Sequence, residues 1–246
     1  MQKTKKSIAK GDFELNPFRL SLLDSSLLTD NTSFINTFSF NRTSSAWGFD
    51  LSNLRNTAKA LLTYGYESRV LNDWVFKLRW NLSDHLAVDV NNRRGENALY
   101  TPGFANRNYE ILTHSSEPRL TYIIGTVFRL QGSYRWEQKE NAGIYGGEKA
   151  RFNVVNLETK YNVLQSSSLQ GRFTFNNISF AKGASANPNV EYIIMEALRP
   201  GNNFLWSLDF TRRLANNVEI NFQYEGRRPA DTKTIHTGRA AIRALF

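Results

Sequence analysis

Long stretches of this chain alternate apolar and polar residues with a period of two, and this pattern constrains the fold most. In residues 128–137, Phe128, Leu130, Tyr134 and Trp136 fall on one side, and polar or charged side chains fall on the other. Successive side chains of a β-strand point to opposite faces, so the pattern predicts a strand with one apolar and one wet face. The alternation recurs near residues 74–82, 86–91, 153–163, 204–213, 218–225 and 235–246. The sequence therefore predicts an all-β fold.

The connections between these strands alternate in length. Short turns are expected near residues 41–44, 82–85, 124–126, 162–168 and 214–217, and long connections near 52–72, 92–118, 138–149, 181–202 and 226–234. Short periplasmic turns and longer external loops are typical of an antiparallel, up-and-down transmembrane β-barrel. Segment 190–198 reads locally as strand or helix, but as a wall strand it would reverse this alternation. We therefore expect it inside an external loop, over or into the lumen.

The strand count is about 11–12. Eleven wall strands can be recognised, whereas single-chain bacterial barrels are normally even-numbered. The barrel is thus incomplete, or part of a larger one, or gains a strand from residues 11–30. Residues 1–31 are expected to be an irregular polar segment and residues 32–246 the barrel domain. The charged opening, Met1 to Lys6, precedes no apolar signal core, so we expect a C-terminal piece whose export signal lies upstream.

Composition excludes several classes of protein. Mean hydropathy is −0.46, and no run reaches the roughly 18–20 apolar residues that a membrane helix needs. Cysteine is absent, which excludes disulfides and thiolate metal sites. The 13% aromatic content suits strands and membrane-interface girdles. The net charge of +9 is spread along strands and turns without a cluster, so no nucleic-acid partner is expected.

The final strand combines lipid-facing and lumen-facing positions. Ile242, Ala244 and Phe246 fall on its apolar face, and the terminal Phe246 looks like the signal that barrels offer to their assembly machinery. Outer-membrane lipid and this machinery are the expected partners, with an upstream region or a partner chain completing the barrel. The charged lumen-facing candidates are Arg129, Arg135, Glu219, Glu225, Arg239 and Arg243. Cross-strand ion pairs that fill the interior and a selectivity role are both open for them.

No catalytic constellation is apparent. The histidines at 85, 114 and 236 are far apart and lack acidic neighbours at ligand spacing, so no metal site, cofactor or catalytic residue is expected. No nucleophile elbow, Walker loop or dinucleotide motif is present. The sequence favours a non-enzymatic outer-membrane protein with a structural, transport or assembly role. Its alternatives are a secreted, soluble β-domain that binds a ligand and a hydrolase at a barrel rim.

Several segments resemble a family of large outer-membrane β-barrel proteins of Bacteroidetes-type bacteria. The resemblance runs from about residue 30 to the end, and it implies a fold and a location in the outer membrane without an activity. The chain departs from the family in lacking its long N-terminal region. The matching segments are residues 46–50 (AWGFD), 62–69 (LTYGYESR), 214–217 (LANN), 223–228 (QYEGRR), 236–240 (HTGRA) and 243–246 (RALF).

Overall fold

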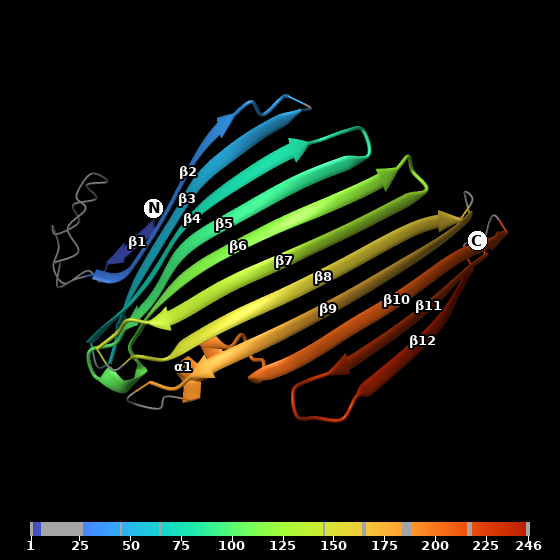
Figure 1. The fold of residues 1–246 in the computed structure, drawn as a ribbon. Coiled ribbons are helices and arrows are strands. Elements are labelled where there is room, and N and C mark those ends of the chain that lie inside the picture. The colour runs from blue at the N-terminus through green and yellow to red at the C-terminus, as the bar shows by residue number, and fades with distance from the viewer. Residues whose placement is uncertain are drawn as a thin grey trace.

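A computed structural model describes residues 2–5, 27–44, 46–63, 65–144, 146–163, 166–183, 188–215 and 218–244. These residues form one antiparallel sheet of twelve strands, in which spatial order follows chain order (Figure 1). The predicted all-β, up-and-down architecture is confirmed. The strands are β1 (Gln2–Lys5), β2 (Leu27–Phe40), β3 (Trp47–Leu62), β4 (Gly65–Asn81), β5 (Leu86–Tyr100), β6 (Tyr109–Ile124), β7 (Phe128–Asn141), β8 (Lys149–Val163), β9 (Ser167–Ala181), β10 (Gly201–Ala215), β11 (Val218–Arg228) and β12 (Ile235–Ala244).

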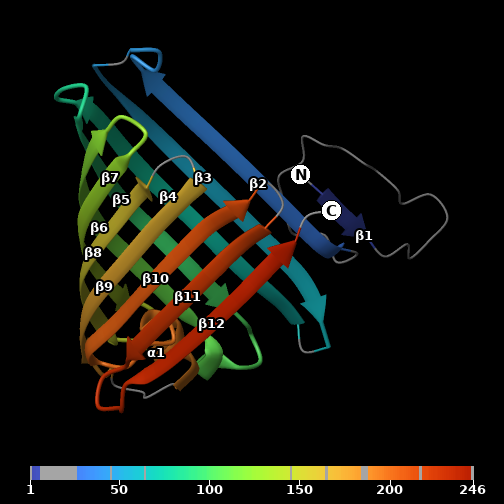
Figure 2. The same cartoon turned by 90° about the vertical axis from the view of Figure 1, so that its right-hand side faces the viewer.

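The sheet curves around an interior but is not closed. Figure 2 shows β2–β5 behind this space and β9–β12 in front of it. Among the described residues, β1 pairs only with β2 and β12 only with β11, which leaves two open edges. The concave side is called the inner face below and the convex side the outer face.

The two ends of the sheet differ in their connections. Short connections such as 41–46, 82–85 and 125–127 lie at one end, called the turn end. The opposite end, called the loop end, carries the 101–108 connection with its 3-10 helix η1 (Ala105–Arg107) and the 182–200 connection. The latter contains helix α1 (Pro188–Ile194), so the expectation that this segment is not a wall strand is confirmed. No helix in the described ranges is long and apolar enough to cross a membrane.

Two of the long connections predicted from the sequence are wrong. The expected 52–72 connection is in fact the end of β3 and the start of β4, with only residues 63–64 between them. The expected 92–118 connection shortens to residues 101–108 because β5 and β6 continue through it. Part of the segment 1–31 is also strand, namely β1 and the start of β2, and residues 6–26 lie outside the described part.

The outer face carries an apolar belt that begins at the turn end. On β4 the belt runs from Trp80 to Trp74, and on β7 from Phe128 to Trp136. Seven to nine residues cover about 20–26 Å of strand, or about 15–20 Å along the membrane normal at the usual strand tilt, which fits within the roughly 25 Å apolar band of membrane barrels. Several belt side chains are 40–60% exposed, because none of the described residues forms a second layer on this side.

The buried apolar residues on the inner face form one small cluster at the loop end. It joins β6, β8 and β9 to α1 and contains Ile111, Ala150, Phe152, Val154, Ile178, Val190 and Ile194. Elsewhere the inner face is mainly polar. A sheet with an apolar outside and a polar inside reverses the arrangement of a water-soluble barrel.

Candidate functional site

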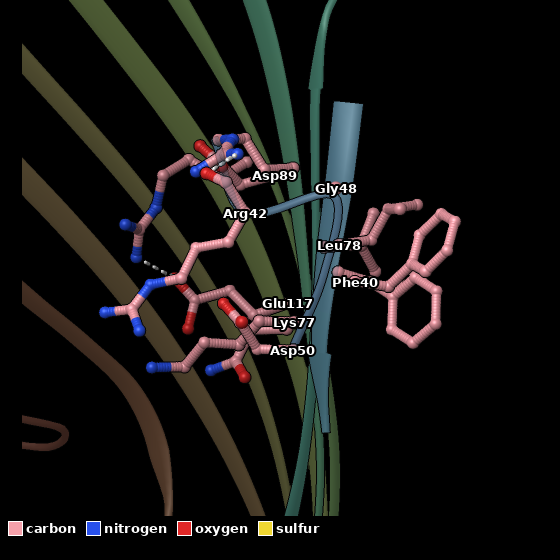
Figure 3. A pocket seen from close by; sticks show the side chains of 13 residues that line it. Phe40, Arg42, Gly48, Asp50, Lys77, Leu78, Asp89 and Glu117 are labelled. Carbon is pink, nitrogen blue, oxygen red and sulfur yellow. Dashed lines mark hydrogen bonds and ion pairs between the residues drawn. The ribbon is translucent and has the colours of Figure 1, made fainter. Parts of the chain in front are cut away.

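Charged side chains from four neighbouring strands meet on the inner face near the turn end. Cross-strand register places Asp50 of β3 opposite Lys77 of β4, and Asp89 of β5 between Arg79 of β4 and Arg119 of β6. Opposite charges in facing positions stabilise a sheet. Figure 3 shows Asp50, Lys77 and Asp89 pointing into the interior, whereas Phe40 and Leu78 point away from it. These side chains line a hollow of about 380 Å³, called the first hollow.

Arg79 also fixes the turn that borders the first hollow. Its Nη2 donates hydrogen bonds to the backbone oxygens of Arg42 and Ser44, both at 3.2 Å. Gly48 permits this approach, because a Cβ there would lie 2.7 Å from the Asn41 oxygen and 3.2 Å from Arg79 Nη2. The guanidinium therefore holds the β2–β3 turn in place.

A second, smaller hollow continues the polar surface across β6–β9. Its volume is about 180 Å³, and it shares Glu117 and Arg119 with the first hollow. Arg119 Nη2 lies 3.0 Å from Glu117 Oε1, and Arg172 Nη2 lies 3.5 Å from Glu158 Oε2. Arg119 Nε is buried without a hydrogen-bond partner among the described residues. Water or a polar solute is the partner expected for such a group. The two hollows form one polar strip across β3–β9.

Helix α1 covers the inner face at the loop end. Val190 and Ile194 are buried and pack within the inner cluster, whereas their neighbour Ile193 is 39% exposed. Figures 1 and 2 place α1 beside the loop end of β9. Because α1 lies against the concave side, it narrows the interior at this end.

An ion-pair cluster holds the residues after α1 against β7. Glu196 Oε1 accepts a hydrogen bond from Lys139 Nζ at 2.6 Å, and its Oε2 lies 3.7 Å from Arg135 Nη2. Both cations also pair with the buried Glu137, at 3.2 and 3.3 Å. Burial acts to raise the pKa of Glu196, but the hydrogen bond and charge of Lys139, with Arg135, outweigh it and lower that pKa. The cluster thus favours the ionised carboxylate that ties α1 to the wall.

The structure places the six predicted lumen residues in two separate groups. Arg129 and Arg135 lie on β7, and Glu219, Glu225, Arg239 and Arg243 lie on β11 and β12. Register brings Arg243 opposite Glu219, and Arg239 opposite Gln223. In the described part of the chain, no ion pair within 4.0 Å joins these facing residues. Phe246 lies outside the described residues.

Sequence reasoning missed the first hollow and the Glu196 cluster. The polar alternation of Lys77, Arg79 and Asp89 was visible, but the register that sets them opposite one another was not. Glu117 lies in the 92–118 segment, where the sequence predicts a connection. Glu196 lies in a loop, and its contact with β7 has no local sequence pattern. Facing charges on strands joined by a short turn, as in β4 and β5, were the one usable indication.

Comparison with known proteins supports the fold. No family model matches the sequence, and no curated protein is similar to it. The siderophore receptor PirA of Acinetobacter baumannii is similar in structure, with a TM-score of 0.63 and 9% sequence identity over 89% of this chain and 38% of the receptor. BauA, the ferric preacinetobactin receptor of the same organism, gives 0.48 with 11% identity over 87% and 42%. The channel CymD gives 0.43 with 6% identity over 89% and 77%.

Of these three, the PirA resemblance has a TM-score above 0.5 and bears on the fold. The chain spans less than half the length of either receptor. The shared curved sheet and the exposed apolar belt agree with the predicted location in the cell outer membrane. The chain has the fold of outer-membrane β-barrel proteins.

Proposed function

We propose that this chain forms a wall of an outer-membrane β-barrel through which small polar solutes pass, without catalysis. The observation that carries the proposal is the contrast between the two faces of the sheet. Trp74 and Trp80 are about half exposed on the outer face. On the inner face, charged residues such as Lys77 and Asp89 line connected hollows. Lipid outside and water inside satisfy both faces.

The position of helix α1 inside the loop end indicates that only small solutes could pass. The helix reduces the open cross-section at the loop end while leaving the first hollow uncovered. A hydrated amino acid, a small sugar or an inorganic ion suits a passage lined by charges of both signs. We expect large or apolar solutes to be excluded, since the interior offers them little apolar surface outside the α1 cluster.

The contacts of the histidines argue for a role without catalysis. His85 Nδ1 lies 3.1 Å from the Ile123 backbone oxygen, and His114 packs edge-on against Trp136. His236 Nδ1 lies 2.7 Å from the Tyr224 hydroxyl. Within the described ranges, no histidine imidazole forms a hydrogen bond or an ion pair with a serine or a carboxylate; His85 meets Ser83 only through its backbone N–H. This disfavours a rim hydrolase, and the exposed outer belt disfavours a soluble ligand-binding domain.

The partners follow from the same architecture. We propose outer-membrane lipid around the belt and strands from the same or another chain along the two open edges. Recognition of the C-terminal strand and Phe246 by the barrel assembly machinery stays a prediction, and so does kinship with the large Bacteroidetes-type barrels. No nucleic-acid partner is proposed.

Conductance tests the proposal. The full chain, refolded into planar lipid bilayers, is expected to give stepwise, ohmic currents carried by small ions. Asp89→Asn and Lys77→Gln are expected to shift the cation-to-anion preference in opposite directions, because each removes one charge from the first hollow. Heat-modifiable gel migration verifies that each preparation is folded. If the protein is folded and inserted but gives no conductance, the proposed solute passage is wrong and the chain has only a structural role.

A further inference from the structure

Four exposed arginines occupy the same position relative to the apolar belt on four different strands. On β3 the outer-face order toward the loop end is Leu51, Asn53, Arg55, and on β5 it is Val90, Asn92, Arg94. Each arginine is thus the second outer-face residue beyond the last apolar one. The same order recurs as Val155, Asn153, Arg151 on β8 and as Tyr224, Gly226, Arg228 on β11. These four arginines are called the arginine ring below.

The cross-strand register confirms that the ring belongs to the outer face. Arg94 faces Trp74, Arg55 faces Phe34, and Arg228 faces Phe204. The ring therefore follows the loop-end border of the belt around the sheet. On β6, His114 takes the same position beyond Pro118 and Ser116, and its imidazole packs against the Trp136 indole with ring centroids 5.8 Å apart.

None of the four guanidiniums is paired with another described residue. Across the described residues, none makes a side-chain hydrogen bond, ion pair or ring contact, and all four are exposed. The acidic residues that share their position do not compensate for them: Asp30 is buried, and Glu140 is bound by Lys149 at 2.8 Å. Five donors on each guanidinium are left for partners beyond the described residues.

The height of the ring matches the lipid headgroups. Each arginine lies about 13 Å beyond the last apolar residue of its own strand, or about 10 Å along the membrane normal at the usual strand tilt. Arg94 also lies opposite Trp74, the last belt residue of the neighbouring strand. The headgroup region extends roughly 5–8 Å beyond the hydrocarbon, and an arginine side chain can reach back toward it. The belt's turn-end border carries one outer-face arginine in the described part, Arg212. The charge is therefore concentrated at the loop-end border.

We propose that the arginine ring binds the phosphate groups of anionic lipids in the leaflet at the loop end. Guanidinium forks match phosphate oxygens in charge and geometry, and arginine keeps its charge at every relevant pH. The proposal rests on the membrane placement above but not on solute passage. The expected ligand is a lipid rather than soluble phosphate, because the ring adjoins the belt and acyl chains there would anchor the phosphate beside the guanidinium.

Tryptophan quenching by brominated lipids tests this in vesicles that contain the full chain. Trp74, Trp136 and Trp206 line the border, so bromines on neighbouring acyl chains report which lipid gathers there. Brominated phosphatidylglycerol is compared with brominated phosphatidylcholine. We expect an enrichment of about fivefold for the anionic lipid beside each arginine. The variant with Arg55, Arg94, Arg151 and Arg228 all changed to Gln should bring the ratio close to one.

A matched variant removes four inner-face cations instead: Arg129, Lys160, Arg239 and Arg243, each changed to Gln. It should retain the enrichment, because these side chains do not face lipid. Equal loss in both variants, or retained enrichment in the ring variant, would overturn the proposal. So would loss of enrichment on adding excess inorganic phosphate at constant ionic strength, which would make the ring a general phosphate site.

Quenching by brominated phosphatidylcholine separates failure of this proposal from failure of the membrane placement. Its presence shows that a variant is inserted, so its lipid ratio can be interpreted. Its absence in the unmodified chain would refute the membrane placement itself. Where the fourfold variant does not insert, Arg94→Gln and Arg151→Gln are measured singly, and an unchanged ratio in both would contradict the proposal.

Discussion

At the scale of residues, the border of the belt depends on one glycine. The Trp206 indole lies over Gly226 on the neighbouring strand, where any Cβ would overlap the ring. This position brings Trp206 to His236, with ring centroids 6.0 Å apart, and His236 in turn stacks on Tyr224. The glycine thus allows an aromatic group to lie across three strands at the membrane border, where amphipathic rings are favoured.

Gly226→Ala should therefore destabilise the folded chain. Overpacking of this kind costs about 1–3 kcal/mol, because the indole must leave its place or the strands must separate. Denaturant unfolding of vesicle-bound protein measures the loss, and tryptophan emission reports movement of the ring. Gly132→Ala on β7 is the control, since a Cβ at that position would have no other atom within 4 Å among the described residues. Equal effects of the two substitutions would show that the indole contact is not the cause.

At the scale of elements, α1 is held to the wall by the apolar inner cluster and by the Glu196 ion-pair cluster. Ile194→Ala truncates a fully buried side chain of the inner cluster and should cost about 2–5 kcal/mol of local stability. The expected result is faster amide exchange in α1 and a larger single-channel conductance. Ile193→Ala is the matched control, because that neighbour is 39% exposed. Unchanged amide exchange in the Ile194 variant would mean that the inner cluster does not hold α1.

The ion-pair cluster makes the attachment of α1 dependent on pH. Since the pKa of Glu196 is lowered below its usual 4.5, the ionised cluster stabilises the folded loop above that pH. The contribution is lost as the pH falls below 4.5 through the lowered pKa. Amide exchange in α1 should accelerate over this acidic range in the unmodified chain. Glu196→Gln should exchange faster at neutral pH and respond less to acid, and an unaltered acid response would exclude Glu196 as the titrating group.

The sequence predicted the belt halves of the strands and missed their loop-end halves for a physical reason. Within the belt, one face meets lipid and the other water, so residues such as Phe76 and Lys77 alternate clearly. Beyond the belt both faces meet polar surroundings, and Asn91, Asn92, Arg93 and Arg94 carry no period of two. Strand pairing continues there through the backbone, which no side-chain pattern reveals. The hollows needed the register as well, because single strands do not indicate which charges face each other.

At the scale of the whole molecule, the orientation of the two faces decides between a membrane wall and a soluble β-domain. Both kinds of protein show the same period-two alternation, because the alternation indicates only that the two faces of a strand differ in polarity. The curvature of the sheet resolves this, because the apolar face is convex and the charged face concave. A soluble barrel of this shape would need its apolar residues inside.

One pair of substitutions on β10 tests that orientation directly. Leu208 lies on the outer face, 46% exposed near the middle of the belt, and the adjacent Ser207 faces inward opposite Glu225. Leu208→Arg should destabilise the membrane-folded chain by about 2–4 kcal/mol, because its charge enters hydrocarbon. Ser207→Arg should cost much less, since it adds a charge to a wet interior beside a carboxylate. Denaturant unfolding from vesicles measures both. A larger loss for Ser207→Arg would mean that the apolar face is not in contact with lipid.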